Sequence, residues 1–374
     1  MIERLYVHNF RGLDNFTLSL AGHPSALLIG RNGSGKSTVR QCLELFQSIG
    51  RRNSRRVHEL ISPGAFTQHR TDIPMKFEIE LVLGRRRFTY AISFDWPETF
   101  RAARIVDESL SADGTSVFAR HHADVQLAGG ATFGLDWHTV ALPVVNVRPD
   151  NTALQTVKAF LASMILTAPV PALMAGFSDE PSLELDMHAT NLASCLSALL
   201  TQKPAVYRNF DTYVRGVITD FFEVEFVPRG ESGYQLVVKF GEATDPLSVD
   251  FNALSDGEKC FILSAYVVAL NSAGSPVFCM WDEPDNHLSL PEVSQFITRL
   301  RKMTNQGGQF LATSHHPEAI RRFSDETTFV LTRTGHLAPS VVRPLTELPR
   351  DGDLIGALLR DEIIGTAVAV QSVG

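Results

Sequence analysis

The octapeptide Gly-Arg-Asn-Gly-Ser-Gly-Lys-Ser at residues 30–37 constrains the fold of this chain more than any other feature. It fits the pattern G-x-x-x-x-G-K-[ST], with an apolar stretch before it and an amphipathic stretch after it. Glycines let consecutive backbone N–H groups turn inward around an anion, and the following helix N-terminus adds partial positive charge. A glycine-rich turn with an incidental lysine would not require this strand and helix. The motif therefore predicts a phosphate-binding loop.

The predicted roles within the loop follow from the chemistry of its side chains. Lys36 would reach the β- and γ-phosphates of a nucleotide, and the Ser37 hydroxyl would bind Mg²⁺. The residues expected to surround the nucleotide are Gly30, Arg31, Asn32, Gly33, Ser34, Gly35, Lys36, Ser37 and Thr38. The loop by itself leaves open a metabolic kinase, a switch, a transporter motor and a clamp on DNA.

Apolar strands alternate with helices at both ends of the chain, which predicts one α/β core built from distant halves. Between them, residues 75–83 and 86–94 alternate strictly and predict a hairpin in a β-rich block. From residue 151 to about 222 the pattern is helical, and one apolar helix covers Ala153 to Leu166. The expected division is an N-terminal part of the α/β core with the phosphate loop and the β-rich lobe (1–150), a helical insertion (151–225), a C-terminal part of the same core (226–345) and a tail (346–374).

Composition limits the setting of the protein. The net charge of −7 argues against a chain that coats nucleic acid, although local basic patches remain compatible with it. The four cysteines have no metal-binding spacing and suit a reducing cytoplasm. The N-terminus lacks a signal-peptide pattern. The uncharged stretch Ala159–Phe177 contains two prolines, so we expect a buried helix and a loop, and no membrane partner.

A second motif supplies acidic side chains at the end of an apolar strand. The strand Pro276–Trp281 runs into Asp282 and Glu283. Beside a phosphate loop, an acid at the position of Asp282 holds Mg²⁺. Because successive side chains of a strand point to opposite faces, Glu283 would point away from Asp282 and could polarise a water molecule. The alternative is a helix cap followed by a surface acid.

A third motif, Leu254-Ser255-Asp256-Gly257-Glu258, begins a predicted helix. Free N–H groups, a hydroxyl and a glycine at a helix N-terminus make a second phosphate-binding end. Ser255 with Glu258 three residues on is also an ordinary capping box, and taken alone the motif favours that interpretation.

In this order, the phosphate loop, LSDGE, the apolar strand with DEP, and TSH (Thr313 to His315) resemble an ABC-type ATPase head of the SMC/RecF/OLD branch. The opening LYVHNFRGLDNFTLSL and the GRNGSGKS loop resemble that branch, and DEPDNHL and ATSHHPEAI are especially similar to OLD-like ATPases of bacterial defence and DNA repair. The resemblance implies a P-loop NTPase fold of the ABC type, with ATP and Mg²⁺ as cofactors. A transporter motor is disfavoured by the opening strand and DEPDNHL.

The resemblance also implies an ATP sandwich between two copies of the chain. Ser255 and Gly257 of one copy would close on the γ-phosphate held by the other. Asp282 would orient Mg²⁺, Glu283 the attacking water, and His315 would contact the γ-phosphate, whereas the alternative for His315 or His316 is a cap on the helix near Pro317.

Two further family features fit this sequence less completely. The arginine that matches the family's is Arg11, and the resemblance places it near the phosphates. The family also has a glutamine in a segment called the Q-loop; here the candidates are Gln126 and Gln155, and neither has a distinctive sequence context.

The 59 residues after His315 are too few for the TOPRIM nuclease that many OLD proteins carry. Asp351-Gly352-Asp353 is interpreted as a turn. We therefore expect an ATPase head without its own nuclease.

Arginine clusters are the candidate contacts for a partner. Arg51, Arg52, Arg55 and Arg56 form the densest cluster, and Arg85, Arg86 and Arg87 another. Such arginines contact nucleic-acid phosphates, but a solvated loop and hairpin tip is an equal interpretation. Two functions remain: a dimeric ATPase that controls a separate effector, such as a nuclease, in phage defence or repair, and a nucleotide-gated DNA- or protein-binding clamp with negligible turnover.

Overall fold

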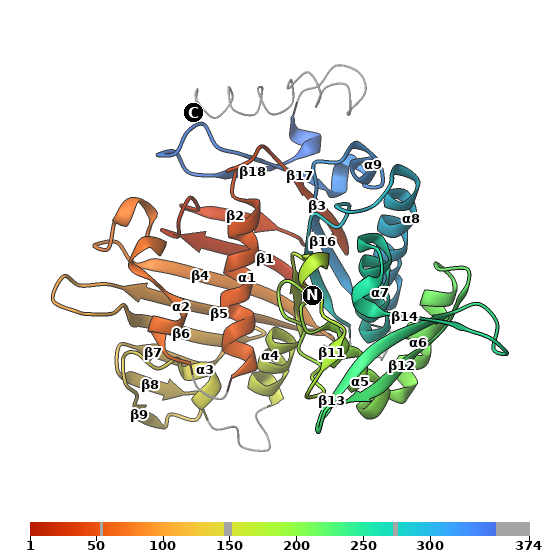
Figure 1. Cartoon of the computed structure of the whole chain (residues 1–374). Helices are drawn as coiled ribbons and strands as arrows, with labels where there is room; N and C mark the ends of the chain where they lie inside the picture. The colour runs from red at the N-terminus through yellow and green to blue at the C-terminus, as the bar shows by residue number, and fades with distance from the viewer. Residues whose placement is uncertain (53–54, 146–151, 272–275, 349–374) are drawn as a thin grey trace. The chain divides into compact units, whose positions relative to one another are not determined.

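The computed structural model describes residues 1–52, 55–145, 152–271 and 276–348, which group into two compact units (Figure 1). Unit 1 comprises Met1–Met164 and Phe323–Gly374, and unit 2 comprises Ile165–Arg322. The first unit joins segments from distant parts of the sequence, whereas the four segments predicted from the strand and helix patterns follow one another along it. The Asp351-Gly352-Asp353 turn lies outside the described residues.

An eight-stranded antiparallel sheet dominates unit 1, in the order β2-β1-β4-β5-β6-β7-β8-β9. Its strands are β1 (Ile2–His8), β2 (Phe16–Ser19), β4 (Met75–Leu83), β5 (Arg86–Asp95), β6 (Arg104–Ala112), β7 (Thr115–His121), β8 (Asp124–Leu127) and β9 (Thr132–Gly134). Alternate residues of β4 are buried, as expected for a sheet with one covered face. The predicted hairpin is confirmed, because Met75 to Leu83 pair with Phe94 to Arg86.

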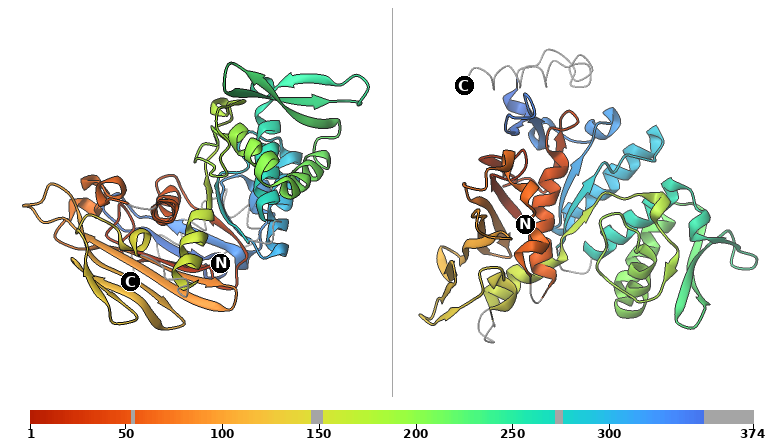
Figure 2. Two further views of the ribbon diagram at one scale, coloured as in Figure 1. Left: turned by 90° about the horizontal axis from the view of Figure 1, so that it is seen from below. Right: turned by 60° about the vertical axis from the view of Figure 1, so that its left-hand side comes forward.

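Helix α1 (Lys36–Arg51) follows the phosphate loop and packs on this sheet, as both views in Figure 2 show. The Phe46 ring meets Phe77 of β4 and Tyr90 of β5 edge to face, with centroids 6.4 and 5.9 Å apart. On its other side α1 touches α4 (Thr152–Ser163), where a Cβ on Gly50 would lie 2.6 Å from the Ala162 nitrogen. This close approach fixes the helix that carries Lys36 at its first position.

Strands from the two ends of the chain pair within unit 1. β3 (Ser25–Ile29) lies parallel to β17 (Thr328–Thr332), and β18 (Val341–Pro344) pairs antiparallel with β17. All five residues of β3 and of β17 are buried, which is typical of parallel strands covered on both faces. The strand that leads into the phosphate loop is thus held by a strand near the other end of the sequence.

Unit 2 has a parallel group of strands and a separate antiparallel sheet. In the parallel group, β15 (Phe278–Asp282) lies between β10 (Ile165–Thr167) and β16 (Gln309–Thr313). The antiparallel sheet consists of β11 (Phe177–Ser178), β12 (Phe221–Arg229), β13 (Gly233–Phe240) and β14 (Leu247–Asp250). The helices of unit 2 are α5 (Leu192–Gln202), α6 (Pro204–Arg215), α7 (Asp256–Asn271), α8 (Leu290–Arg301) and α9 (Pro317–Ile320).

Short helices complete the described chain. They are α2 (Val57–Leu60), α3 (Ala141–Val144), η1 (Pro63–Ala65), η2 (Thr67–His69), η3 (Pro171–Leu173), η4 (Phe251–Ala253), η5 (Lys302–Gln306), η6 (Asp325–Thr327) and η7 (Leu345–Glu347).

The expected helical segment 151–225 also contains strands. The predicted helix over Ala153–Leu166 ends at Ser163, and Ile165–Thr167 form β10. The helical pattern expected up to Phe222 ends at Arg215, and β12 begins at Phe221. In both places a short apolar run fits either period, and pairing with β15 or β13 decides for the strand.

Candidate functional site

The phosphate loop in unit 1 has the backbone that the glycines were expected to provide. Gly30, Gly33 and Gly35 have φ values of 157°, 77° and 113°, which side chains disfavour. A Cβ on Gly30 would lie 2.3 Å from the Leu331 carbonyl oxygen. Gly35 precedes α1, and no side chain caps this end of the helix. A helix N-terminus carries partial positive charge, which favours an anion beside it.

Lys36 lies inside the curve of the loop. Its side chain is buried, and Nζ donates to the carbonyl oxygens of Gly30 at 2.7 Å and Arg31 at 3.3 Å. Ser37 and Thr38 follow on the first turn of α1. A buried ammonium group, a helix N-terminus and a glycine backbone fit the triphosphate of a nucleotide, because all three supply positive charge or donors.

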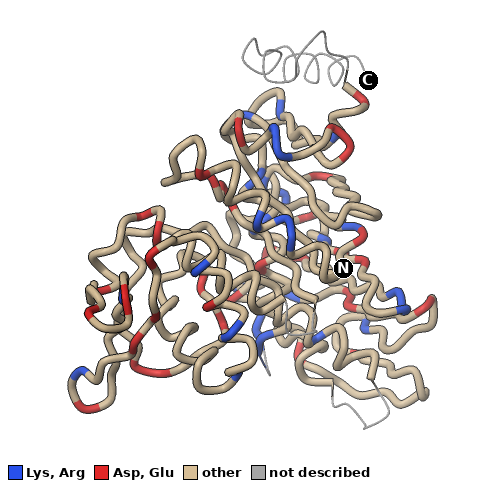
Figure 3. The backbone as a smooth tube through the Cα atoms, turned by 90° about the vertical axis from the view of Figure 1, so that its right-hand side faces the viewer, with Lys and Arg blue, Asp and Glu red and all other residues tan. Residues whose placement is uncertain are grey.

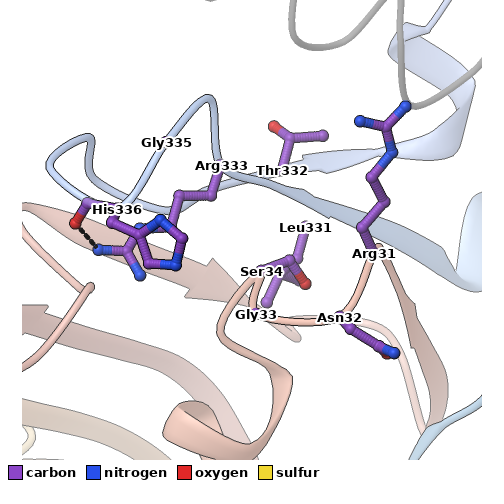
Figure 4. Close-up of a pocket in the computed structure, with 9 residues that line it drawn as sticks. All are labelled: Arg31, Asn32, Gly33, Ser34, Leu331, Thr332, Arg333, Gly335 and His336. Atoms are coloured by element: carbon purple, nitrogen blue, oxygen red, sulfur yellow. Dashed lines mark hydrogen bonds between the residues drawn. The ribbon is translucent and has the colours of Figure 1, made fainter.

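A cavity of about 130 Å³ adjoins the loop within unit 1 (Figure 4). Its lining residues are Arg31, Asn32, Gly33, Ser34, Leu331, Thr332, Arg333, Gly335 and His336. None of these nine described residues is acidic. The Ser34 hydroxyl is buried without a hydrogen-bond partner. Arg333 donates to the carbonyl oxygens of Ala338, at 2.8 Å, and His336, which shapes the loop after β17.

Sequence reasoning missed this loop after β17. The segment from Leu331 to His336 was placed in the C-terminal part of the head (226–345) without a role at the phosphate loop, because the pairing of β3 with β17 joins distant parts of the sequence. Its sequence signal is an apolar strand, TFVLT, that ends in arginine and glycine residues.

Arg11 lies on the segment that precedes the phosphate loop, also in unit 1. Its φ of 52° is unusual for a non-glycine residue, and its backbone N–H donates to the Ala65 carbonyl at 2.7 Å. The guanidinium group lies over the Phe10 ring and acts electrostatically on Cys42 of α1. Burial raises the pKa of the Cys42 thiol well above its usual value, and the Arg11 charge partly opposes that increase.

Asp282 is the last residue of β15 in unit 2 and Glu283 follows it, and Thr313 at the end of β16 binds both. The Thr313 hydroxyl donates to the Asp282 carboxylate and accepts from the Glu283 backbone N–H at 3.0 Å. The Glu283 N–H also reaches the Thr313 carbonyl oxygen at 3.2 Å. Glu283 has a φ of 52°, so the chain turns sharply there and separates the two carboxylates.

The side chains around Glu283 bring His315 into the same cluster. His315 Nε2 lies 3.8 Å from Glu283 Oε1, and Asn286 Nδ2 donates to Glu283 Oε2 at 2.8 Å. His316, in contrast, caps α9, because its Nδ1 accepts from the Glu318 N–H at 3.1 Å. Of the two histidines that were considered as helix caps, His316 is therefore the cap.

Asp285 is a buried acid beside this cluster that sequence reasoning did not single out. It is 6% exposed, and Oδ1 has no hydrogen-bond partner. Burial raises the pKa of this carboxyl group, although a hydrogen bond from Ser314 acts in the opposite direction.

The LSDGE motif forms the start of α7, as predicted, and it contains the capping box. The Ser255 backbone N–H and hydroxyl both donate to Glu258 Oε2, at 2.8 and 2.7 Å, and the Glu258 N–H donates to Ser255 Oγ at 3.3 Å. Ser255 is exposed, and a Cβ on Gly257 would lie 3.5 Å from the His287 carbonyl oxygen. Helix α7 thus begins next to the loop that follows Glu283.

The other predicted positions lie outside these clusters. Gln126, on β8, and Gln155, on α4, are exposed. Arg52 and Arg56 are exposed, whereas Arg55 bonds Ser48 and forms an ion pair with Glu59 at 2.6 Å.

Arg51 and the hairpin arginines also make contacts within the chain. Arg51 donates to the Ala162 carbonyl oxygen at 3.2 Å. In the second cluster Arg86 pairs with Asp113 at 2.9 Å. Figure 3 shows basic and acidic positions interspersed on the side that it presents. Within the described residues, no helix is long and apolar enough to cross a membrane.

Comparison with known proteins identifies the family and the fold of the chain. Residues 1–337 match the RecF/RecN/SMC N terminal domain family. No curated protein matches the chain. An SMC head bound to the C-terminal winged-helix domain of ScpA matches with 13% identity and a TM-score of 0.58, over 92% of this chain and 99% of that one.

A second solved structure gives the same fold. An SMC head with an extended coiled coil, bound to the C-terminal domain of ScpA derived from Pyrococcus furiosus, matches with 12% identity and a TM-score of 0.53. The match covers 96% of this chain and 98% of that one. At these identities the likeness concerns the fold, which is the predicted α/β P-loop fold of the ABC type. The chain is an ABC-type ATPase head of the SMC/RecF branch and belongs to the RecF/RecN/SMC N-terminal domain family.

Proposed function

We propose that this chain binds and hydrolyses Mg-ATP, dimerises around the nucleotide and thereby controls a partner effector or a DNA transaction. The observation that carries the proposal is the phosphate loop. Its three glycines have positive φ, and the Lys36 ammonium group is held on the loop's own carbonyl oxygens. That arrangement fits a triphosphate because a glycine backbone of this kind can turn N–H groups toward an anion and the ammonium group adds positive charge.

The proposed roles of the remaining residues follow from their chemistry. The Ser37 hydroxyl and the Asp282 carboxylate are oxygen ligands of the kind that Mg²⁺ prefers. Bound Mg²⁺ would neutralise charge on the phosphates. Glu283 is the general base that polarises the attacking water, and His315, 3.8 Å from the Glu283 carboxylate, contacts the γ-phosphate. Arg11 adds positive charge near the phosphates.

In the proposed dimer, Ser255 and Gly257 of one copy close on the γ-phosphate of the other. The Ser255 N–H and hydroxyl that now bond Glu258 are donors of the type that an anion requires. The γ-phosphate would therefore compete with Glu258 for the same two groups. Such competition links dimer closure to the presence of a third phosphate.

The setting that we propose is bacterial phage defence or DNA repair, as in OLD-like ATPases, with a separate effector protein such as a nuclease. The solved SMC heads that share the fold are each bound to a partner protein. Exposed Arg52 and Arg56, with Arg51 and Arg55 beside them, are the proposed contacts with DNA phosphates. Four buried free thiols support a cytoplasmic location.

Phosphate release separates this function from a nucleotide-gated clamp with negligible turnover. We expect the wild type to release phosphate from Mg-ATP and the Glu283→Gln variant to be at least about 100-fold slower, because general-base assistance contributes on this scale. The measurement is made with and without DNA. Background release by both proteins would exclude the ATPase and leave the clamp.

Light scattering of Glu283→Gln with and without ATP tests the dimer. Because this variant binds ATP but does not consume it, we expect the mass to double when ATP is added. Lys36→Ala is the matched control and should stay monomeric, since it lacks the ammonium group that holds the phosphates. A Glu283→Gln monomer under both conditions would contradict the sandwich.

A further inference from the structure

Glu283 occupies a backbone conformation that its neighbours must maintain. Its φ of 52° is in the left-handed region, which a side chain with a Cβ disfavours. Two hydrogen bonds from its N–H to Thr313 hold the backbone on one side. On the other side the Asn286 N–H donates to the Glu283 carbonyl oxygen at 3.2 Å and closes a tight turn. The backbone of Glu283 is therefore fixed from both neighbouring segments.

The side chain of Glu283 is restrained by the same turn. Asn286 Nδ2 donates to Oε2 at 2.8 Å, and Oε1 faces His315 Nε2 at 3.8 Å. The two carboxylate oxygens thus have different environments. Since Oε2 is engaged by the amide, Oε1 is the oxygen left to face the histidine and a reacting water.

We propose that Asn286 is a positioning residue that selects the rotamer of Glu283 in which Oε1 accepts the proton of the attacking water. The proposal rests on the proposed ATPase function. A general base must lie within hydrogen-bond reach of its proton, and a glutamate with unrestrained rotamers spends much of its time elsewhere. An amide suits the role because it donates a hydrogen bond and leaves the carboxylate charge in place.

Because Asn286 lies at the surface, its side chain can be changed with little effect on packing. Its side chain is exposed, so Asn286→Ala opens no cavity. Asn286→Asp has the same shape but replaces the donor by an acceptor that faces Glu283. We expect kcat for Mg-ATP to fall about tenfold in Asn286→Ala and further in Asn286→Asp, with KM changed less than about twofold. Exposed Asn305 of η5 supplies the matched control, Asn305→Ala, with no change expected.

A double-mutant cycle with Glu283→Gln shows whether Asn286 acts through Glu283. If it does, Asn286→Ala lowers kcat in the wild-type background and has no further effect in the Glu283→Gln background. Wild-type kcat in Asn286→Ala and Asn286→Asp, or an equal loss in both backgrounds, would overturn the inference and leave the ATPase intact. A wild type that releases no phosphate would overturn the ATPase and the inference with it.

Discussion

The Thr313 hydroxyl joins the two acids of the site, and removing it gives the sharpest test of the geometry. Thr313→Val keeps the shape of this buried side chain, so no cavity forms. It removes the bond to the Asp282 carboxylate and one of the two bonds from the Glu283 N–H. The other bond of that N–H, to the Thr313 carbonyl oxygen, remains.

The expected loss of stability follows from the type of each hydrogen bond that Thr313→Val removes. A hydrogen bond to a charged group contributes about 1.5–3 kcal/mol, and a neutral one about 1 kcal/mol. Asp282 is only partly buried, and water can replace some of the lost bond. The Glu283 N–H keeps a partner. We therefore expect Thr313→Val to lower the free energy of unfolding of unit 2 by about 2 kcal/mol.

Thr313→Ser separates the hydroxyl from the methyl group. It keeps both hydrogen bonds and loses one buried methyl group, which costs about 1 kcal/mol. Two assays compare the variants: urea unfolding at neutral pH, and hydrogen exchange of the native protein measured on the peptide that contains residues 278–286. Thr298→Val on α8, whose hydroxyl bonds only the Ser294 carbonyl within its own helix, is the control. A valine variant as stable as the wild type, or a serine variant less stable than valine, would refute the reasoning.

Two further predictions concern unit 1 and the thiols. Gly30→Ala should destabilise the protein by about 3 kcal/mol or more, since strain adds to overlap with the Leu331 carbonyl, whereas Gly33→Ala, with open space around its Cβ, should cost about 1–2 kcal/mol of strain alone. Thermal melting compares the two variants, and equal shifts in melting temperature would contradict a steric overlap at residue 30. Burial raises the pKa of Cys260 to about 12, so its thiol stays protonated at pH 8. We expect all four cysteines to react with Ellman's reagent only after denaturation; rapid labelling of the native protein would show that the buried thiols are accessible.

The features that could be predicted from the sequence are those that a few neighbouring residues encode. The phosphate loop and the start of α7 at Asp256 were predicted, because a short motif of adjacent residues specifies each of them. The hairpin of β4 and β5 followed from strict alternation. The strand β10 was mistaken for helix, because three apolar residues carry no period of their own and pairing with β15 decides.

The cavity lining after β17 and the contact of Asn286 with Glu283 were not predicted. The cavity lining depends on the pairing of β3 with β17, and no local sequence pattern indicates that pairing. The second requires the left-handed backbone of Glu283, a conformation that glutamate rarely adopts and that only tertiary contacts can impose. Positions such as these, where local preference and structure disagree, are where functional residues tend to lie.

The pairing of β3 with β17 also has a consequence for protein synthesis. A ribosome makes the phosphate loop well before β17, the strand that supports it. At about 5–20 residues per second, the delay is on the order of tens of seconds. During that time the nascent loop lacks its neighbouring strand, so an unfinished chain should be a poor nucleotide binder. Ribosome-bound fragments that lack β17 would then be kept from entering dimers.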